Sequence, residues 1–273
     1  MSKKFLEIPL NWFICPVTKE NFAQKNGVLC SSFRCFKKNK KYGFWDFMPK
    51  NAKDLNKPIW KIWEKLQANA MVIYTNDPMH NLGVGKRKDF LEFAKFCNFK
   101  GVILDVGVGP QKNPTHIAFC RKKNVFFVGL DSLIGEQPRP FAFVRGLAEY
   151  LPFRSKLFDM VLFITTLDHF IDPSTALKEA KRVLKNNGTI CIWTGEKNKN
   201  TPKVKKNPEW YKKIKIPKGV QDKFHFKRFS SKELEKYFDK INLKIKKKKV
   251  IRIDKWRKNL FYKIKKNEKL FKI

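Results

Sequence analysis

The sequence predicts an α/β fold in which a mostly parallel sheet is covered by helices on both faces. Five short runs of consecutive apolar residues are separated by segments long enough for a helix. Strands that are buried on both faces read as such continuous runs, whereas a half-exposed strand alternates apolar and polar residues. A glycine-rich turn follows the first run, as is common where a strand leads into a helix of a parallel sheet. Together these features predict repeated strand–helix–strand units.

The expected strands follow one another at regular intervals along the chain. They cover residues 102–104, 125–130, 141–144, 160–164 and 189–193. The clearest helix precedes the last of them: Pro173 and Ser174 are typical of a helix start, and Asn187-Gly188 is typical of a helix end. Its inward face is predicted to consist of Ala176, Leu177, Ala180 and Val183.

The rest of the chain divides by composition into further segments. Residues 1–50 contain short β-type runs and form a small N-terminal segment, residues 51–98 read as a helical connector, and residues 99–273 form the main domain. Within that domain, residues 196–228 are polar, rich in lysine and hold three prolines, which predicts a lid. A helix should follow at Ser230, because Glu233 completes a capping box. Alternating apolar residues at 241–245 and 251–253 predict late strands with one solvated face.

The composition limits the broad class of protein. The chain has 273 residues, 42% of them hydrophobic, and a formal net charge of +36. Such a charge suits nucleic acid, an anionic membrane or an acidic substrate. Because the lysines are spread over every segment, a compositional bias explains the charge better than a specific partner does. The most apolar run, residues 160–167, is too short to span a bilayer, and no secretory signal is recognisable. We therefore expect a soluble, cytoplasmic protein with free thiols.

The chemistry is concentrated in the turn after the first strand. Here Asp105 is followed by Gly107 and Gly109, where a side chain would block close approach of a ligand to the backbone. A dinucleotide site needs another glycine where this chain has Lys112. Asp105 would also repel a pyrophosphate, whereas it suits a ligand with an ammonium group and a sulfonium centre. The pattern therefore favours S-adenosylmethionine over a nicotinamide dinucleotide.

Further candidate residues lie at the ends of the next strands. Asp131 ends the second strand, 24 residues after Gly107, and an acid there accepts hydrogen bonds from a ribose diol. Taken alone it reads equally well as a solvated loop carboxylate, but its pairing with Asp105 favours the binding role. Asp168 and His169 follow the fourth strand, where either could act as a base. The alternative for His169 is a capping or packing role, and for His225 it is packing among phenylalanines rather than reaching the substrate.

Three segments between residues 102 and 193 resemble the class I S-adenosylmethionine-dependent methyltransferases of the type 11 group. They are residues 146–153 (GLAEYLPF), 158–161 (FDMV) and 179–188 (EAKRVLKNNG), in the order and spacing of that family. The resemblance implies a Rossmann-like fold with a mixed, mostly parallel, seven-stranded sheet and S-adenosylmethionine as cofactor. Leu147 and Gln111 depart from the family pattern, where an acid and a glycine are usual.

The resemblance also implies a role for each matching position. The methionine part of the cofactor would lie beside Asp105, Gly107 and Gly109, and the ribose beside Asp131. Ala148 and Glu149 would lie beside the adenine, and the turn from Thr165 to Leu167 would close over the reacting methyl group. As catalytic residues we expect Asp168 and His169.

The N-terminal segment resembles a small zinc-ribbon-like module found ahead of some of these domains. Cys15, Cys30 and Cys35 match three of its ligands, but Thr18 stands where the fourth cysteine would be. Structural zinc normally takes four nitrogen or sulfur ligands. We therefore expect a metal-free relic of the ribbon rather than a zinc site. Its packing would come from the aromatic residues Trp12, Phe13, Phe33, Phe44 and Trp45.

The expected activity is methyl transfer to an oxygen, nitrogen or carbon nucleophile of a small molecule or a glycan or lipid precursor, because type 11 members mostly act on metabolites. One alternative is an RNA methyltransferase that uses the lysines of 244–249 and of the lid for phosphate contacts. Another is a non-catalytic binding protein for the same cofactor, suggested by Leu147 and Gln111. A third places the basic C-terminus, with Trp256, Leu260, Phe261 and Tyr262, on an anionic membrane surface. The oligomeric state stays open.

Overall fold

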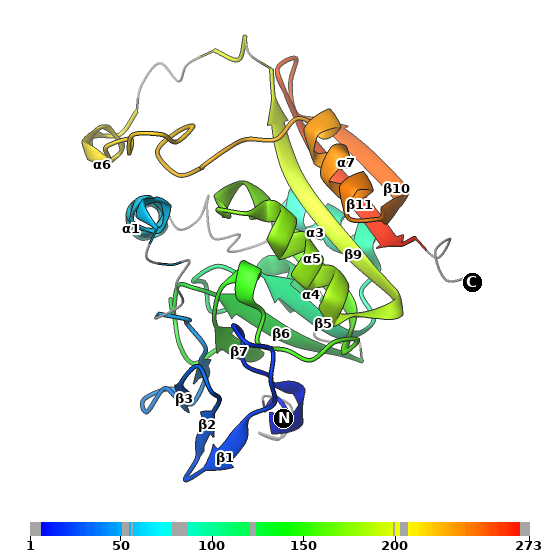
Figure 1. The fold of residues 1–273 in the computed structure, drawn as a ribbon. Coiled ribbons are helices and arrows are strands. Elements are labelled where there is room, and N and C mark those ends of the chain that lie inside the picture. The colour runs from blue at the N-terminus through cyan, green and yellow to red at the C-terminus, as the bar shows by residue number, and fades with distance from the viewer. Residues whose placement is uncertain are drawn as a thin grey trace.

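A computed structural model describes residues 7–50, 55, 57–77, 87–120, 124–198, 200–202 and 207–267. Its strands form one mixed sheet, with helices in front of and behind it (Figure 1). The strands are β1 (Ala23–Lys25), β2 (Val28–Cys30), β3 (Cys35–Lys38), β4 (Trp45–Asp46), β5 (Gly101–Val106), β6 (Val125–Asp131), β7 (Ala142–Arg145), β8 (Phe158–Ile164), β9 (Leu184–Lys197), β10 (Leu243–Arg252) and β11 (Arg257–Lys266). The α-helices are α1 (Pro58–Asn76), α3 (Lys88–Cys97), α4 (Thr115–Cys120), α5 (Pro173–Val183), α6 (Glu209–Lys213) and α7 (Ser231–Lys240), and short 3-10 helices are η2 (Leu10–Trp12), η4 (Ala148–Tyr150) and η5 (Leu167–His169).

The strands from β5 to β11 form the seven-stranded portion that the sequence predicts. Their order is β7-β6-β5-β8-β9-β11-β10. The five strands from β7 to β9 are parallel, whereas β11 runs antiparallel to both β9 and β10. This arrangement confirms the Rossmann-like α/β fold with a mixed, mostly parallel sheet.

The N-terminal segment extends the same sheet instead of forming a separate one. Strand β4 pairs in parallel with β7, and β1–β3 continue outward from it, which brings the sheet to eleven strands. An ion pair of 3.0 Å joins Asp46 Oδ2 to Arg145 Nη1 across this junction. The ring of Phe13 also packs 5.6 Å from that of Phe153. The segment is therefore held on the main domain by backbone pairing and by aromatic contacts.

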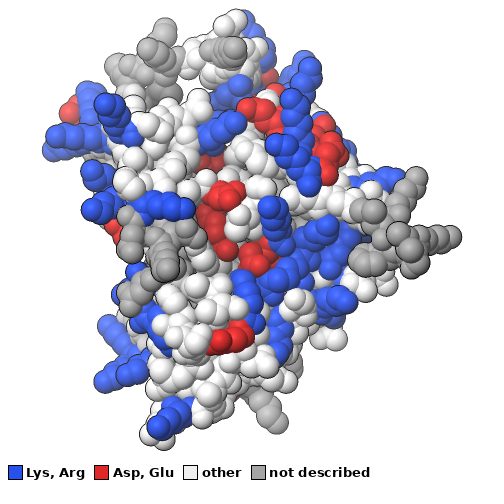
Figure 2. Space-filling view, in the orientation of Figure 1, with Lys and Arg blue, Asp and Glu red and all other residues white. Residues whose placement is uncertain are grey.

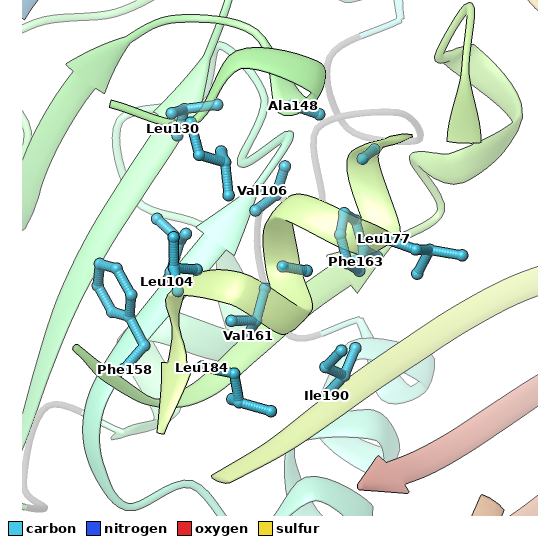
Figure 3. Packing of buried hydrophobic residues seen from close by; sticks show 14 of the residues in the cluster. Leu104, Val106, Leu130, Ala148, Phe158, Val161, Phe163, Leu177, Leu184 and Ile190 are labelled. Atoms are coloured by element: carbon cyan, nitrogen blue, oxygen red, sulfur yellow. The ribbon is translucent and has the colours of Figure 1, made fainter. Parts of the chain in front are cut away.

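Two hydrophobic cores lie on opposite faces of the sheet. On one face Leu104, Val161 and Ile190 pack against α5 and α7, as Figure 3 shows for part of this cluster. On the other face Ile103 and Leu162 pack against α3 and α4. Neighbouring residues of one strand thus enter different cores, because successive side chains of a strand point to opposite faces. This explains why the central strands read as unbroken apolar runs.

Helix α5 is shorter than the sequence suggests. Asp172 caps its start by accepting a hydrogen bond from the Thr175 amide, and the helix ends at Val183. Residues 187–188, expected to close the helix, belong to β9 instead. A side chain on Gly188 would lie 3.0 Å from the carbonyl oxygen of Asp159, so the glycine here permits close approach of β9 to β8. The capping box at Ser230 and Glu233 is confirmed at the start of α7.

The end of the chain differs most from the sequence prediction. Separate strands were expected at 241–245 and at 251–253. Both ranges overlap the single strand β10 instead, and Ile241 lies at the C-cap of α7. Strand β11 was not predicted. It lies between β9 and β10, so Leu260, Phe261 and Tyr262 are fully buried. The expectation that these residues rest on a membrane is therefore wrong, because the sheet already covers them.

The cysteines correct another expectation. Cys30 and Cys35 lie directly opposite each other on β2 and β3, with their Cα atoms 4.0 Å apart, and form a disulfide. The prediction of free thiols is therefore wrong for these two. It holds for Cys15, Cys97, Cys120 and Cys191, which are buried and not joined in a disulfide. The Cys15 sulfur accepts hydrogen bonds from the Thr18 amide and the Ser31 hydroxyl, and the zinc-ribbon-like character of the segment is not confirmed.

The molecular surface is basic without a single dominant patch on the face that Figure 2 shows. Lysine and arginine side chains occur over all parts of this face, with a denser group right of the centre and a small acidic group near the middle. In the described part of the chain, no helix combines the length and apolarity needed to cross a membrane.

Candidate active site

A cavity of about 890 Å³ opens at the carboxyl ends of β5, β6 and β8. Its floor consists of the loops that follow these strands. Helix α1 and the segment 207–228 line its other side, and α1 and α6 lie near each other on the same side of the sheet (Figure 1). Ligands of parallel α/β folds bind at this edge of the sheet, because the loops there are all on one side.

The glycine turn forms the base of this cavity. Gly107 and Gly109 have φ angles of +78° and +80°, which side chains disfavour. A Cβ atom on Gly107 would lie 2.6 Å from the Thr166 methyl carbon, and one on Gly109 would lie 2.5 Å from Gln111 Oε1. Gln111, where the family usually has a glycine, donates a hydrogen bond to the Val108 carbonyl. The departure at this position therefore leaves the turn intact and braces it.

Asp105 lies at the end of β5 and is fully buried. Its Oδ2 atom is 2.7 Å from His116 Nε2 on α4, and its Oδ1 atom has no hydrogen-bond partner. The ring of Phe90 stacks on His116 at 5.7 Å and holds it in place. A buried carboxylate oxygen without a partner is costly unless a ligand or water completes its hydrogen bonds. The site thus offers an acceptor for a cationic group.

Asp131 lies at the end of β6, next to the same turn. Its two carboxylate oxygens accept hydrogen bonds from the Gly109 and Leu133 amides, both at 2.8 Å. Burial raises the pKa of Asp131, and these two bonds only partly oppose the effect. The carboxylate therefore braces the glycine turn and keeps lone pairs for a further donor in the cavity.

The next loop brings Ala148 and Glu149 to the cavity wall in η4. Glu149 is 8% exposed, and its Oε1 atom accepts hydrogen bonds from the Ile171 and Asp172 amides. Burial raises the pKa of Glu149 to about 7. Leu147, which stands where the family often has an acid, is buried and also lines the cavity. Glu149 thus joins this loop to the turn after β8.

The turn after β8 contains a strained residue. Thr165 has a φ of +55°, which is rare for a β-branched residue, and its amide donates to the Trp193 carbonyl. The neighbouring Thr166 donates its hydroxyl hydrogen to the Val106 carbonyl, which joins this turn to the glycine turn. Strain of this kind is common at functional sites, where the surrounding contacts maintain it.

A cluster of polar side chains lies beyond this turn. Asp168 and His169 come from η5. His225 comes from the segment 207–228 on the other side of the cavity, which we call the roof. The two imidazole rings are 4.4 Å apart, and His225 Nε2 is 3.6 Å from Asp168 Oδ2. Burial and the neighbouring His225 lower the pKa of His169 to about 4. His169 is therefore uncharged at neutral pH.

Two charged side chains of the roof surround His225. Asp222 Oδ1 is 2.7 Å from His225 Nδ1, and Arg228 Nε donates to Asp222 Oδ2 at 3.1 Å. Although burial acts in the opposite direction, the hydrogen bond from His225 and the charge of Arg228 lower the pKa of Asp222. Arg228 Nη1 is also 3.6 Å from Asp168 Oδ2.

Helix α1 is bonded to the roof segment. The Asn69 side-chain amide donates to the carbonyls of Lys215 and Lys223, the second at 2.8 Å. Trp63 and Tyr74 from α1 line the cavity, as do Trp210 and Tyr211 from the roof. The cavity thus has an aromatic cover opposite its acidic floor.

All of the residues predicted to bind the cofactor or to act in catalysis line this one cavity. They are Asp105, Gly107, Gly109, Asp131, Ala148, Glu149, Thr165, Asp168 and His169. Sequence reasoning missed His116, Asp222, Arg228 and the lining face of α1. His116 could have been identified from the sequence, because it lies in the helix that follows the glycine turn. Asp222 and Arg228 bond to each other or to His225 within the segment 207–228, and nothing in the sequence shows that this segment and α1 line the same cavity as the strand ends. The turn-rich residues 83–85, noted as an interruption of the connector, lie outside the described residues.

Comparison with known proteins agrees with this geometry. Residues 104–192 match a sequence family described as a methyltransferase domain. An uncharacterized protein of Methanocaldococcus jannaschii is 34% identical over 99 residues, which are 34% of this chain and 44% of that protein. The chain therefore spans less than half the length of that relative.

Solved structures share the fold. A 1,6-didemethyltoxoflavin-N1-methyltransferase of Burkholderia thailandensis, with bound S-adenosylhomocysteine, has a TM-score of 0.55 at 13% identity and covers 87% of this chain and 97% of its own. A SAM-dependent methyltransferase of Leishmania major has a TM-score of 0.53 at 12% identity, covering 78% of this chain and 87% of its own. The [4+2]-cyclase SpnF also has a TM-score of 0.55, at 12% identity, covering 74% and 97%. The fold therefore accommodates more than one reaction.

The residues of the cavity floor fit S-adenosylmethionine. Asp105 has a buried oxygen without a partner, suited to a cationic group, and the glycine turn leaves room that a Cβ would fill. Asp131 lies one strand away with lone pairs for a diol. With the family match and the shared fold, the chain carries an S-adenosylmethionine-dependent methyltransferase domain of the type 11 family over residues 104–192.

Proposed function

We propose that this protein transfers the methyl group of S-adenosylmethionine to a nucleophilic atom of a small molecule that binds in the roofed part of the cavity. One observation carries the proposal. The same cavity contains the carboxylates and glycine turn of the floor and, beyond Thr165, the cluster of Asp168, His169 and His225. Cofactor and acceptor would therefore meet at the turn after β8.

In this proposal the floor binds the cofactor. Asp105 and the turn at Gly107 and Gly109 bind the methionine part, Asp131 binds the ribose, and η4 with Ala148 and Glu149 lies against the adenine. Burial raises the pKa values of Asp131 and Glu149, so their charges cost the folded protein free energy. Buried groups of this kind are more common at ligand sites than in ordinary packing.

The chain's own contribution to the reaction is alignment and the exclusion of water. The sulfonium of the cofactor is already an activated electrophile, which leaves little other chemistry to the protein. Thr165, held by its hydrogen bond to Trp193, positions the turn between the cofactor and the acceptor. The acceptor gains a methyl group and loses a proton. Asp168, His169 and His225 line the part of the cavity where the acceptor would lie, so they are candidate bases for that proton.

The cover of the cavity favours a small acceptor over RNA. Helix α1 and the roof, joined by the two hydrogen bonds of Asn69, close one side of the cavity. The lysines and arginines are distributed over the face in Figure 2, with a denser group right of the centre. An oxygen, nitrogen or carbon nucleophile of a metabolite or of a glycan or lipid precursor is compatible with this space.

The test is incubation with methyl-labelled S-adenosylmethionine and fractionated cell extract. We expect label in small-molecule, lipid or sugar fractions, and less label with an Asp131→Asn variant when the cofactor concentration is limiting. Label in RNA would show that the methyl acceptor is RNA and not a small molecule. Calorimetric binding of S-adenosylhomocysteine without transfer of label to any fraction would favour the non-catalytic alternative, and a lack of binding would refute the proposal.

A further inference from the structure

Asp168, His169 and His225 bring three metal-binding side chains together. One ligand atom from each residue lies within 4.8 Å of those from the other two. Among the described residues, this is the one group of at least three possible metal ligands that lie so close together. Asp168 Oδ1 is 3.9 Å from His169 Nε2, and Asp168 Oδ2 is 3.6 Å from His225 Nε2. Asp168 is 7% exposed, and its buried Oδ1 atom has no hydrogen-bond partner.

The outer contacts of both histidines orient their other nitrogen toward this group. His169 Nδ1 is 3.0 Å from the Phe224 carbonyl oxygen, which only accepts hydrogen bonds, so Nδ1 carries the hydrogen. His225 Nδ1 faces the Asp222 carboxylate in the same way, at 2.7 Å. Each ring therefore has its lone pair on Nε2, beside Asp168. Histidine ligands of metals typically donate their other ring hydrogen to a carbonyl or a carboxylate, as both do here.

We propose that Asp168, His169 and His225 bind a divalent transition-metal ion that holds the methyl acceptor. This inference rests on the proposed function, because the three residues line the acceptor part of the same cavity. Two imidazoles and one carboxylate favour ions such as Zn²⁺, Co²⁺, Ni²⁺ or Fe²⁺ over Mg²⁺ or Ca²⁺, which prefer oxygen ligands. Three protein ligands leave at least one position for an acceptor oxygen or nitrogen.

The distances require only a small closure of the cluster. Metal–ligand bonds of about 2.0–2.2 Å place neighbouring ligand atoms roughly 3.0–3.5 Å apart. The two histidine–carboxylate separations of 3.9 and 3.6 Å are only slightly longer. These two separations reach different oxygens of Asp168, and the three ligand atoms lie within 4.8 Å of one another, so a bound ion would draw the two imidazoles toward Asp168.

Positively charged side chains also lie near the cluster. Arg228 Nη1 is 3.6 Å from Asp168 Oδ2, beyond hydrogen-bond length, while its Nε is bonded to Asp222. Lys197 is a further cation near these groups, and burial and Arg228 lower its pKa. Two carboxylates, Asp168 and Asp222, offset the two cations. Without an ion, the Asp168 carboxylate faces the positive charge of Arg228. A bound ion would place its own positive charge beside this carboxylate.

Metal binding would also connect two parts of the chain. Asp168 and His169 follow β8, whereas His225 belongs to the roof. An ion shared by them would fasten the roof over the acceptor. The competing interpretation is that the same three residues act without metal as a proton-transfer group.

The test uses full-length protein without a histidine tag, stripped with chelator and titrated with Co²⁺ alone. We expect one Co²⁺ per chain with visible ligand-field bands, and at least about tenfold weaker binding in His225→Gln and in His169→Gln. Cys15→Ser is the matched control for the other set of metal-binding side chains, and Asp254→Asn is the control for an exposed acid. Both should bind Co²⁺ like the wild type.

A second measurement does not depend on the variants. In wild-type protein with ¹⁵N-labelled histidine, Zn²⁺ should shift the resonances of two of the 4 histidines. Unmoved resonances, or Co²⁺ binding that the two histidine variants leave unchanged, would overturn the metal site and favour the metal-free proton-transfer group. S-adenosylhomocysteine binding, measured in parallel without metal, reports on the proposed function. If wild-type protein does not bind S-adenosylhomocysteine, the proposed function is refuted. If it binds S-adenosylhomocysteine but not Co²⁺, the metal site alone is refuted.

Discussion

Replacing Asp131 by asparagine should weaken cofactor binding far more than it changes stability. The carboxylate accepts two backbone hydrogen bonds of 2.8 Å, from Gly109 and Leu133, and asparagine has only one oxygen to replace them. Burial raises the pKa of Asp131, so removal of the charge relieves a desolvation cost while one amide loses its acceptor. These effects oppose each other, and we expect the free energy of unfolding to change by less than about 1 kcal/mol.

Binding has no such compensation. An asparagine loses the charge-assisted hydrogen bonds to the ribose diol, which contribute about 1–3 kcal/mol, or roughly a 5- to 150-fold change in Kd. Titration calorimetry with S-adenosylhomocysteine measures this change, and urea unfolding measures the stability. In both assays the variant is compared with wild-type protein at one pH and ionic strength.

Asp159→Asn is the matched control for this experiment. Asp159 also accepts a backbone hydrogen bond, from Val102 at 2.8 Å, and pairs with Lys185, but it lies at the amino end of β8, away from the cavity. Although burial acts to raise it, the pKa of Asp159 is lowered by these partners, so its charge stabilises the fold. This variant should lose about 1 kcal/mol of stability and bind S-adenosylhomocysteine normally. Unchanged binding in Asp131→Asn, or equal weakening in both variants, would refute the placement of the ribose.

Three further predictions follow from the geometry. Gly107→Ala should cost roughly 2–4 kcal/mol of stability in urea unfolding, because of its φ of +78° and the contact with Thr166; an unchanged midpoint would contradict the tight turn. Burial raises the pKa of Glu149 from 4.5 to about 7, so its contribution is present below about pH 4.5 and is lost as pH rises to 7. The wild type should thus lose about 3 kcal/mol more than Glu149→Gln across this range, and parallel pH profiles would contradict it. Reduction of Cys30–Cys35 should lower stability by roughly 2 kcal/mol and leave S-adenosylhomocysteine binding intact; weaker binding would connect β2–β3 to the cavity.

Sequence reasoning succeeded where the physical cause is local. The central strands are recognisable because both of their faces are buried, which removes polar residues from the runs around Leu104, Val128 and Val161. The turn at Gly107 and Gly109 is recognisable because a positive φ and a close neighbour both require glycine. The capping box at Ser230 depends on residues three positions apart. Each of these features leaves a pattern within a few residues of the chain.

It failed where pairing between distant strands decides the environment. Strand β11 carries many lysines, but its central residues are buried because it lies between β9 and β10. The end of α5 was misplaced because Gly188 serves the contact with β8 and not a helix cap. Cys30 and Cys35 are joined because the pairing of β2 with β3 places them opposite each other. The residues can be read from the sequence, but the pairing of distant strands that brings them together cannot.

From the residue pattern alone, strand-end carboxylates and a glycine turn are expected at one edge of a parallel sheet, because parallel strands end together and their loops must meet. What lies opposite that edge depends on the folded chain. His225 is far from His169 along the chain, yet their rings lie 4.4 Å apart. Helix α1, which reads as a mere connector, supplies a wall of the cavity. These contacts depend on how the roof and α1 fold back over the sheet, and folding-back of this kind is set by long-range packing and leaves no periodic pattern in the sequence.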